Sequence, residues 1–136
     1  MDSFEMTVAA DGDLPALVLS VPTGDDLDRI TEICQDTDIQ EWTFVPRNYQ
    51  RSDAEFFVEQ VVVNGWSEGR ELTWGVREVG GDDASSTLVG MLGVSLSGPE
   101  DARTGEIGYW LTAAAQGRGT MTRAVAALID TAFDAE

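Results

Sequence analysis

The chain has 136 residues, enough for one domain with a single hydrophobic core. Its formal charge of −17 comes from 25 acidic residues against eight arginines, and it has neither lysine nor histidine. This charge disfavours nucleic acid and anionic membranes as partners, and the missing histidine excludes a Ser-His-Asp triad. The acidic residues lack the spacing of a calcium loop, so no metal site is predicted. No apolar run approaches the roughly 20 residues that a membrane-spanning helix needs.

The N-terminal end predicts a lead-in followed by a strand. Residues 1–13 are mixed in character, and we expect a loose lead-in to a single domain at 14–136. The first residues are acidic and lack the basic and apolar regions of a signal peptide, which favours a cytoplasmic protein. Residues 14–21 are apolar with a proline near their start, a pattern typical of an edge strand.

A capped helix is predicted next. Residues 23–26 supply a threonine cap and an acidic first turn, and Leu27, Ile30 and Cys34 then share one helical face. Cys34 is the only cysteine, so it cannot form an internal disulfide. We expect it to be a small buried hydrophobic residue and not a nucleophile.

Residues 37–51 are rich in aromatic side chains without a clear period. A connection of this length in a compact domain is often functional, so aromatic residues such as Trp42 and Tyr49 are candidates for shaping a pocket. The alternative is that these aromatics only fill the core.

A second helix is predicted from residues 52–55, which have the spacing of a capping box, to Asn64 and Gly65, which are expected to end it. Three strands follow at 72–79, 87–97 and 105–111, joined by short turns, and a last helix begins near Thr120. Consecutive strands with short turns indicate an antiparallel meander. The sequence therefore predicts an α+β fold, in the order strand, two helices, three strands, helix, with a largely antiparallel sheet flanked by helices.

The turn before the last helix contains Gly117, Arg118 and Gly119, followed by Thr120. The first amides of a helix lack partners within the helix, and glycines in front of them let these donors converge on an anion such as a phosphate. Arg118 adds positive charge to this turn. A glycine turn that merely starts a helix is the alternative. The segment is neither a Walker loop nor a dinucleotide fingerprint, because the required glycine-lysine pair and third glycine are absent.

Residues 105–111, followed after four residues by 116–121, resemble the acyl-CoA site of the GNAT superfamily of N-acetyltransferases. The family motif is Gln/Arg-x-x-Gly-x-Gly/Ala, in which Gln116 and Gly119 match and Met121 departs. The Ile-Gly-Tyr-Trp-Leu run resembles the ribosomal-protein N-terminal acetyltransferase branch. The resemblance covers about residues 14–136.

The resemblance implies acetyl-CoA as a substrate and an amine as the acceptor, and Trp42 and Tyr49 are the candidates for lining the acceptor pocket. It implies that backbone groups of Tyr109, Trp110 and Leu111 pair with the pantetheine arm, and that an amide near Leu111 stabilises the oxyanion. It also implies a pyrophosphate site formed by the residues of the glycine turn, namely Gln116, Gly117, Arg118, Gly119, Thr120 and Met121.

Acetyl transfer needs a neutral amine and therefore a base. Glu106 enters the strand that carries the implied cofactor contacts, and it is the candidate base. The alternative for Glu106 is a surface residue of the strand or a structural hydrogen-bond acceptor.

Complete members of the family continue beyond the third helix into further strands and a helix, so the resemblance implies that the C-terminal part of the domain is missing here. The strand at 105–111 would then have an unpaired side, which a second copy of the chain could cover as a homodimer. Two functions remain open from the sequence. One is an acetyl-CoA-dependent N-acetyltransferase, and the other is a catalytically silent module that binds CoA or another protein.

Overall fold

The computed structural model describes residues 3–12, 14–42, 45–79, 86–99, 104–112, 115–117 and 119–134. Its elements, in chain order, are β1 (Met6–Val8), β2 (Leu17–Ser20), the 3-10 turn η1 (Gly24–Asp26), α1 (Leu27–Ile33), α2 (Thr37–Trp42), α3 (Arg51–Phe56), the π-helical segment η2 (Phe57–Val62), α4 (Val63–Glu68), β3 (Glu71–Val79), β4 (Ser86–Ser97), β5 (Thr104–Leu111) and α5 (Thr120–Asp134).

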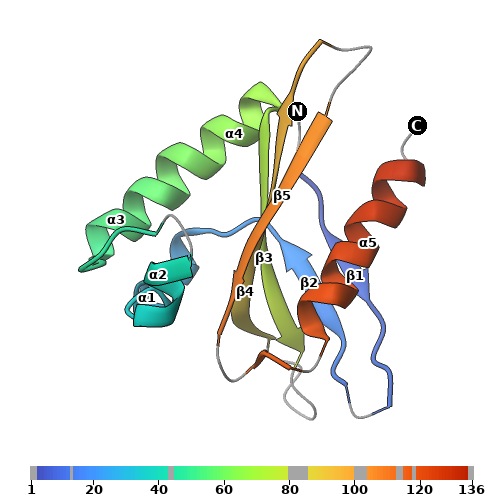
Figure 1. Cartoon of the computed structure of the whole chain (residues 1–136), viewed down its shortest axis with the longest axis horizontal. Coiled ribbons are helices and arrows are strands. Elements are labelled where there is room, and N and C mark those ends of the chain that lie inside the picture. Colours follow the sequence, from blue (N-terminus) through green and yellow to red (C-terminus); the bar gives the residue numbers. More distant parts are fainter. Residues whose placement is uncertain are drawn as a thin grey trace.

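The strands form one five-stranded sheet in the order β1-β2-β3-β4-β5, and each neighbouring pair is antiparallel. Figure 1 shows α1 to α4 on one face of this sheet and α5 on the other. The predicted α+β fold, its meander β3-β4-β5 and the helix α5 are confirmed. Among the described residues, no helix is both long enough and apolar enough to span a membrane.

The expected loose lead-in is wrong in part, because residues 1–13 contribute β1 to the sheet. Met6 pairs with Leu19 and Val8 with Leu17, and Met6 is buried in the core. β1 has only three residues, too few for an alternating pattern to be visible in the sequence.

The second helix differs from its prediction at both ends. It begins at Arg51, and its capping box is formed by Gln50 and Asp53, not by residues 52–55. Gly65 does not end the helix but lies inside α4, where a Cβ atom would stand 2.2 Å from the carbonyl oxygen of Glu71. The helix ends at Glu68 and is capped by Gly69, which has a φ of +66°. Gly65 is therefore needed for the close approach of helix and strand.

Two apolar clusters hold the layers together. One contains Trp74 of the sheet together with residues of α5, and it also includes Trp66 of α4. The other lies between the sheet and α1 to α3 and contains Ile30. Phe57 packs against both clusters. Cys34 belongs to the second cluster and is 1% exposed, which confirms its prediction as a buried residue.

A buried ion pair connects the start of α1 to β3. Both terminal nitrogens of Arg77 donate hydrogen bonds to the carboxylate of Asp26, at 2.6 and 2.8 Å. Asp26 also accepts a hydrogen bond from the amide of Thr23. This contact and the predicted threonine cap together form a capping box, which was not predicted at this helix from the sequence. The pair fixes α1 over the sheet and so fixes one wall of the cavity described below.

Candidate functional site

The outer edge of β5 exposes main-chain hydrogen-bonding groups. The amide of Thr112 donates to the carbonyl oxygen of Val89 at 2.8 Å, and Leu111 is the register partner of Gly90. Because hydrogen-bonded and non-hydrogen-bonded pairs alternate in an antiparallel ladder, Trp110 directs its main-chain groups towards β4. Tyr109 and Leu111 direct theirs towards the free edge.

The glycine turn is attached to this edge by a side chain. Nε2 of Gln116 donates a hydrogen bond of 2.9 Å to the carbonyl oxygen of Leu111. The amide of Gln116 itself donates to the carbonyl oxygen of Thr112 at 3.2 Å. Gln116 therefore fixes the turn against the end of β5, and its own amide is already used within the protein.

Gly117 and Gly119 have φ values of +81° and +71°, in the left-handed region that favours glycine. A Cβ atom built on either residue would meet no other atom within 4 Å, so open space lies beside the turn. Among the described residues, no backbone oxygen accepts a hydrogen bond from the amides of Gly117, Gly119, Thr120 or Met121. Within the described part of the chain, these amides are therefore candidate donors to an external acceptor.

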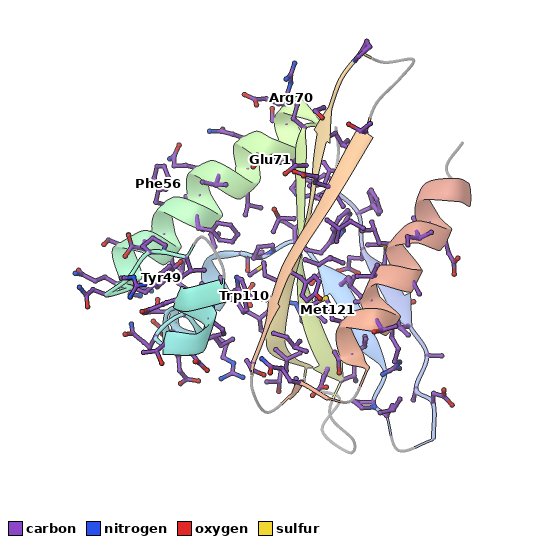
Figure 2. The ribbon with its side chains drawn as sticks, in the orientation of Figure 1. Tyr49, Phe56, Arg70, Glu71, Trp110 and Met121 are labelled. Carbon is purple, nitrogen blue, oxygen red and sulfur yellow. The ribbon has the colours of Figure 1, made fainter. Side chains whose placement is uncertain are left out.

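Met121 and Thr120 point into the protein. Met121 is 7% exposed and belongs to the apolar cluster beneath α5, so its side chain fills the core and not the space beside the turn. Thr120 is buried, and its hydroxyl lies 3.4 Å from a carboxylate oxygen of Glu78. Met121 departs from the family motif, but its side chain packs in the core and so leaves the space beside the turn open (Figure 2).

Two arginines, Arg118 and Arg123, lie close to the glycine turn in the sequence. Arg118 lies outside the described residues. Nη2 of Arg123, in the first turn of α5, donates to the carbonyl oxygen of Ala9 at 2.8 Å. Its Nη1 is buried without a hydrogen-bond partner among the described residues.

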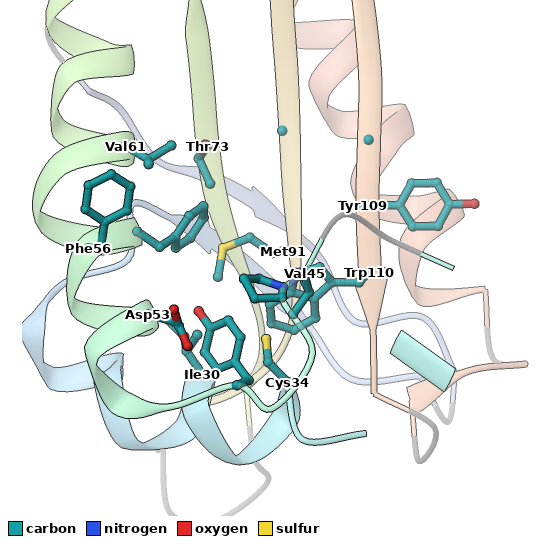
Figure 3. Close-up of a pocket in the computed structure, with 15 residues that line it drawn as sticks. Ile30, Cys34, Val45, Asp53, Phe56, Val61, Thr73, Met91, Tyr109 and Trp110 are labelled. Carbon is teal, nitrogen blue, oxygen red and sulfur yellow. The ribbon is translucent and has the colours of Figure 1, made fainter. Parts of the chain in front are cut away.

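A cavity of about 500 Å³ lies on the opposite face of the sheet, under α1 and α3. Its lining is mostly apolar and includes Val45, Phe57, Met91 and Trp110. Figure 3 shows Trp110 turned towards the cavity and the Tyr109 side chain turned away from it. The Tyr109 side chain is 58% exposed, so this residue borders the cavity with its main chain.

Of the two predicted acceptor residues, the structure places Tyr49 in the cavity wall. Tyr49 is 6% exposed and is a neighbour of Cys34, which also lines the cavity. Burial raises the pKa of the Cys34 thiol to about 12, so the thiol is neutral at ordinary pH. Trp42 ends α2, and its side chain lies outside what the structure describes.

Glu106 does not line the cavity; its side chain is exposed on β5. Among the described lining residues, the one charged side chain is that of Asp53. The position of Asp53 in the cavity wall could not be predicted, because in the sequence Asp53 is recognisable only as a helix-capping residue. Its carboxylate does accept a hydrogen bond from the amide of Gln50, at 2.8 Å. No group of three or more acidic or cysteine residues suited to a metal ion occurs among the described residues.

Comparison with known proteins gives the following likenesses. The acetyltransferase (GNAT) domain family matches residues 16–136. Among solved structures, a crystal structure of a probable acetyltransferase superposes with a TM-score of 0.65 at 20% identity, over 93% of this chain. This chain spans 66% of the length of that one. No curated protein sequence matches.

Proposed function

The chain belongs to the GNAT acetyltransferase family, and from this premise we propose that it transfers an acetyl group from acetyl-CoA to a primary amine. The amine attacks the thioester directly in a ternary complex with both substrates. The observation that carries the proposal is at the N-terminal end of α5, where the amides of Gly117, Gly119, Thr120 and Met121 meet no backbone acceptor within the described part of the chain. Open space lies beside the two glycines.

The diphosphate of CoA fits this turn by its chemistry. Amides at a helix N-terminus favour a negative group, by about 0.3–1 kcal/mol from the helix dipole and about 1.5–3 kcal/mol for each charge-assisted hydrogen bond. Such local terms act at short range, whereas the repulsion from the distant acidic residues is screened beyond about 8 Å at physiological salt. Local donors therefore outweigh the net charge of −17.

The free edge of β5 is proposed to bind the pantetheine arm of CoA. Tyr109 and Leu111 direct main-chain groups to this edge, so the pantetheine arm is proposed to bind there like an added strand. The carbonyl of Leu111 is held by Gln116, which leaves the Leu111 amide as the candidate donor to the oxyanion. The backbone of Trp110 was also expected to pair with this arm, but its main-chain groups face β4, so that expectation is wrong. Only its indole, in the cavity wall, is proposed to contribute to substrate binding.

Glu106 is proposed as the base, either directly or through water. It lies on β5 on the same face as Gly108 and Trp110, because residues two and four apart on a strand share a face. A positioned base contributes typically 10²–10⁴-fold to the rate. Glu106→Gln should therefore lower kcat by at least about 100-fold with an unchanged affinity for CoA. Glu71→Gln, in the same cross-strand row but on β3, is the matched control.

The decisive experiment measures thiol release from acetyl-CoA with a panel of amines, together with calorimetry of CoA binding. Release that depends on both the amine and the protein supports the transferase. Binding of CoA without release would instead identify the silent CoA-binding module. If Arg118→Glu leaves the affinity for CoA unchanged, the assignment of the glycine turn is wrong.

The free edge of β5 is also where a second copy of the chain could pair to form a homodimer. A second copy that paired with β5 would occupy the main-chain groups proposed to bind the pantetheine arm. A homodimer through this edge and CoA binding therefore exclude each other. Light scattering with and without CoA tests this, because CoA should shift such a dimer to the monomer.

A further inference from the structure

Three small residues form a row across the floor of the cavity. Thr73 on β3 is the register partner of Gly93 on β4, and Gly93 is the register partner of Gly108 on β5. All three line the cavity. Towards the free edge of β5, the cavity floor therefore consists of main chain alone, at Gly93 and Gly108.

The backbone does not require glycine at these two positions. Neither Gly93 nor Gly108 is among the described glycines with positive φ. A Cβ atom on Gly108 would meet nothing within 4 Å, and one on Gly93 would meet its nearest atom, the carbonyl oxygen of Leu72, at 3.8 Å. Glycine weakens a strand, so two paired glycines within β4 and β5 cost stability without relieving a clash. Their effect in the structure is to leave open space above the cavity floor.

The rows on either side differ in character. Met91 and Trp110 are register partners, and Figure 3 shows both side chains at the cavity beyond Thr73. On the other side, about 7 Å along the strands, Ser95 pairs with Glu106. A molecule lying across the glycine row thus has apolar surface on one flank and a carboxylate on the other.

The charge of the lining selects the sign of the ligand. Asp53 is the charged side chain among the described lining residues, and the rest of the lining is mostly apolar. A carboxylate in apolar surroundings favours a cation and disfavours an anion. A cation without an apolar body would leave most of the cavity wall uncovered.

We propose that the cavity binds a small organic ammonium with an aromatic or similarly bulky apolar body, and that Gly93 and Gly108 set this specificity. The body lies against Met91, Phe57 and Trp110, and a slender aminoalkyl arm crosses the glycine row towards β5. That such an amine is acetylated rests on the proposed function. That it binds in the cavity does not. Unbranched polyamines and peptide N-termini are disfavoured.

The experiment measures binding to the intact chain by tryptophan fluorescence, with and without CoA. The ligands are 2-phenylethylamine, its neutral analogue 2-phenylethanol, spermidine, and tetra-alanine amide as a peptide N-terminus. We expect 2-phenylethylamine to bind at least about tenfold more tightly than the other three, since it alone combines the charge with the apolar body.

The variants Gly108→Ala and Gly93→Ala place a methyl group on the cavity floor without a protein clash. Each should weaken 2-phenylethylamine binding about tenfold, as expected for an overfilled site. Gly105→Ala is the matched control on β5, because its methyl group faces Val94 and Leu96 on the opposite face of the sheet. Asp53→Asn keeps an acceptor for the Gln50 amide. Because Glu106 remains beyond the glycine row, this variant should reduce, but not abolish, the preference for 2-phenylethylamine over 2-phenylethanol.

Tighter binding of spermidine or tetra-alanine amide, wild-type affinity in Gly108→Ala, or no amine binding at all would overturn the inference. The two proposals fail separately. Cavity binding without thiol release from acetyl-CoA would refute the transferase alone. Thiol release with tetra-alanine amide, without binding of 2-phenylethylamine, would refute the specificity alone.

Discussion

The side-chain amide of Gln116 donates a hydrogen bond to the main-chain carbonyl of Leu111, at 2.9 Å. This contact joins the two parts of the proposed acetyl-CoA site, because Leu111 ends β5 and Gln116 begins the glycine turn. The contact occupies an acceptor at the sheet edge and leaves the neighbouring amide donor available.

Gln116→Ala should therefore weaken CoA binding about fivefold, the effect of one lost hydrogen bond that positions a turn. Calorimetric titration of CoA measures it. Gln60→Ala, which removes an exposed glutamine from η2, is the control and should bind CoA as the wild type does. An equal loss in both variants would contradict the role of Gln116.

Gly119→Ala should lower both stability and CoA affinity. A non-glycine residue at a φ of +71° costs about 1–2 kcal/mol, and the methyl group would project into the open space beside the turn. Gly12→Ala is a close control, since Gly12 has a φ of +59° and also has no atom within 4 Å of its Cβ position. Both variants should lose similar thermal stability, but Gly119→Ala alone should lose CoA affinity.

The Asp26–Arg77 pair should make stability depend on pH. Burial by itself raises the pKa of Asp26, but the hydrogen bonds from Arg77 and the Thr23 amide outweigh it and hold the pKa below the ordinary value of 3.8. A lowered pKa in the folded state stabilises the protein above the unfolded-state pKa, and this contribution is lost as the pH falls through the folded-state value.

Asp26→Asn should accordingly lower the free energy of unfolding by about 3 kcal/mol at pH 7, because Arg77 keeps a buried charge without its partner. Urea unfolding at pH 7 and at lower pH measures the difference, which should shrink as the wild-type carboxylate is protonated. Asp28→Asn, in an exposed pair with Arg51, should change the stability little at either pH.

Cys34 should react slowly with thiol reagents in the folded protein. Its burial raises the pKa of the thiol to about 12, and its side chain is 1% exposed. We expect labelling at pH 8 to be at least about 100-fold slower than in urea, since little thiolate is present and the reagent cannot reach it. Rapid labelling of folded protein would show that the cavity wall opens.

Local pattern was sufficient for much of the fold. β3, β4, β5 and α5 were predictable because their hydrophobic periods extend over eight or more residues. Gly65 was misread because its reason is tertiary, namely the approach of Glu71 to the helix. A glycine after asparagine has the same appearance in the sequence whether it ends a helix or lies inside one.

The cavity was beyond the reach of the sequence for a related reason. Gly93 and Gly108 become neighbours only through the register of β4 and β5, which is a long-range pairing. Asp53 likewise reaches the cavity through the packing of α3 against the sheet. The glycine turn was predictable because its meaning lies in consecutive residues, Gly117 to Thr120.

The π-helical segment η2 has a consequence for insertions and deletions. Its wider turns set the rotational phase between α3, whose Asp53 borders the cavity, and α4, whose Trp66 donates a hydrogen bond of 3.0 Å to the carbonyl of Thr73. Removing one residue would rotate one helix against the other by about 100°. Asp53 could then no longer border the cavity while Trp66 keeps its hydrogen bond to Thr73. This segment should therefore tolerate substitution far better than a change of length.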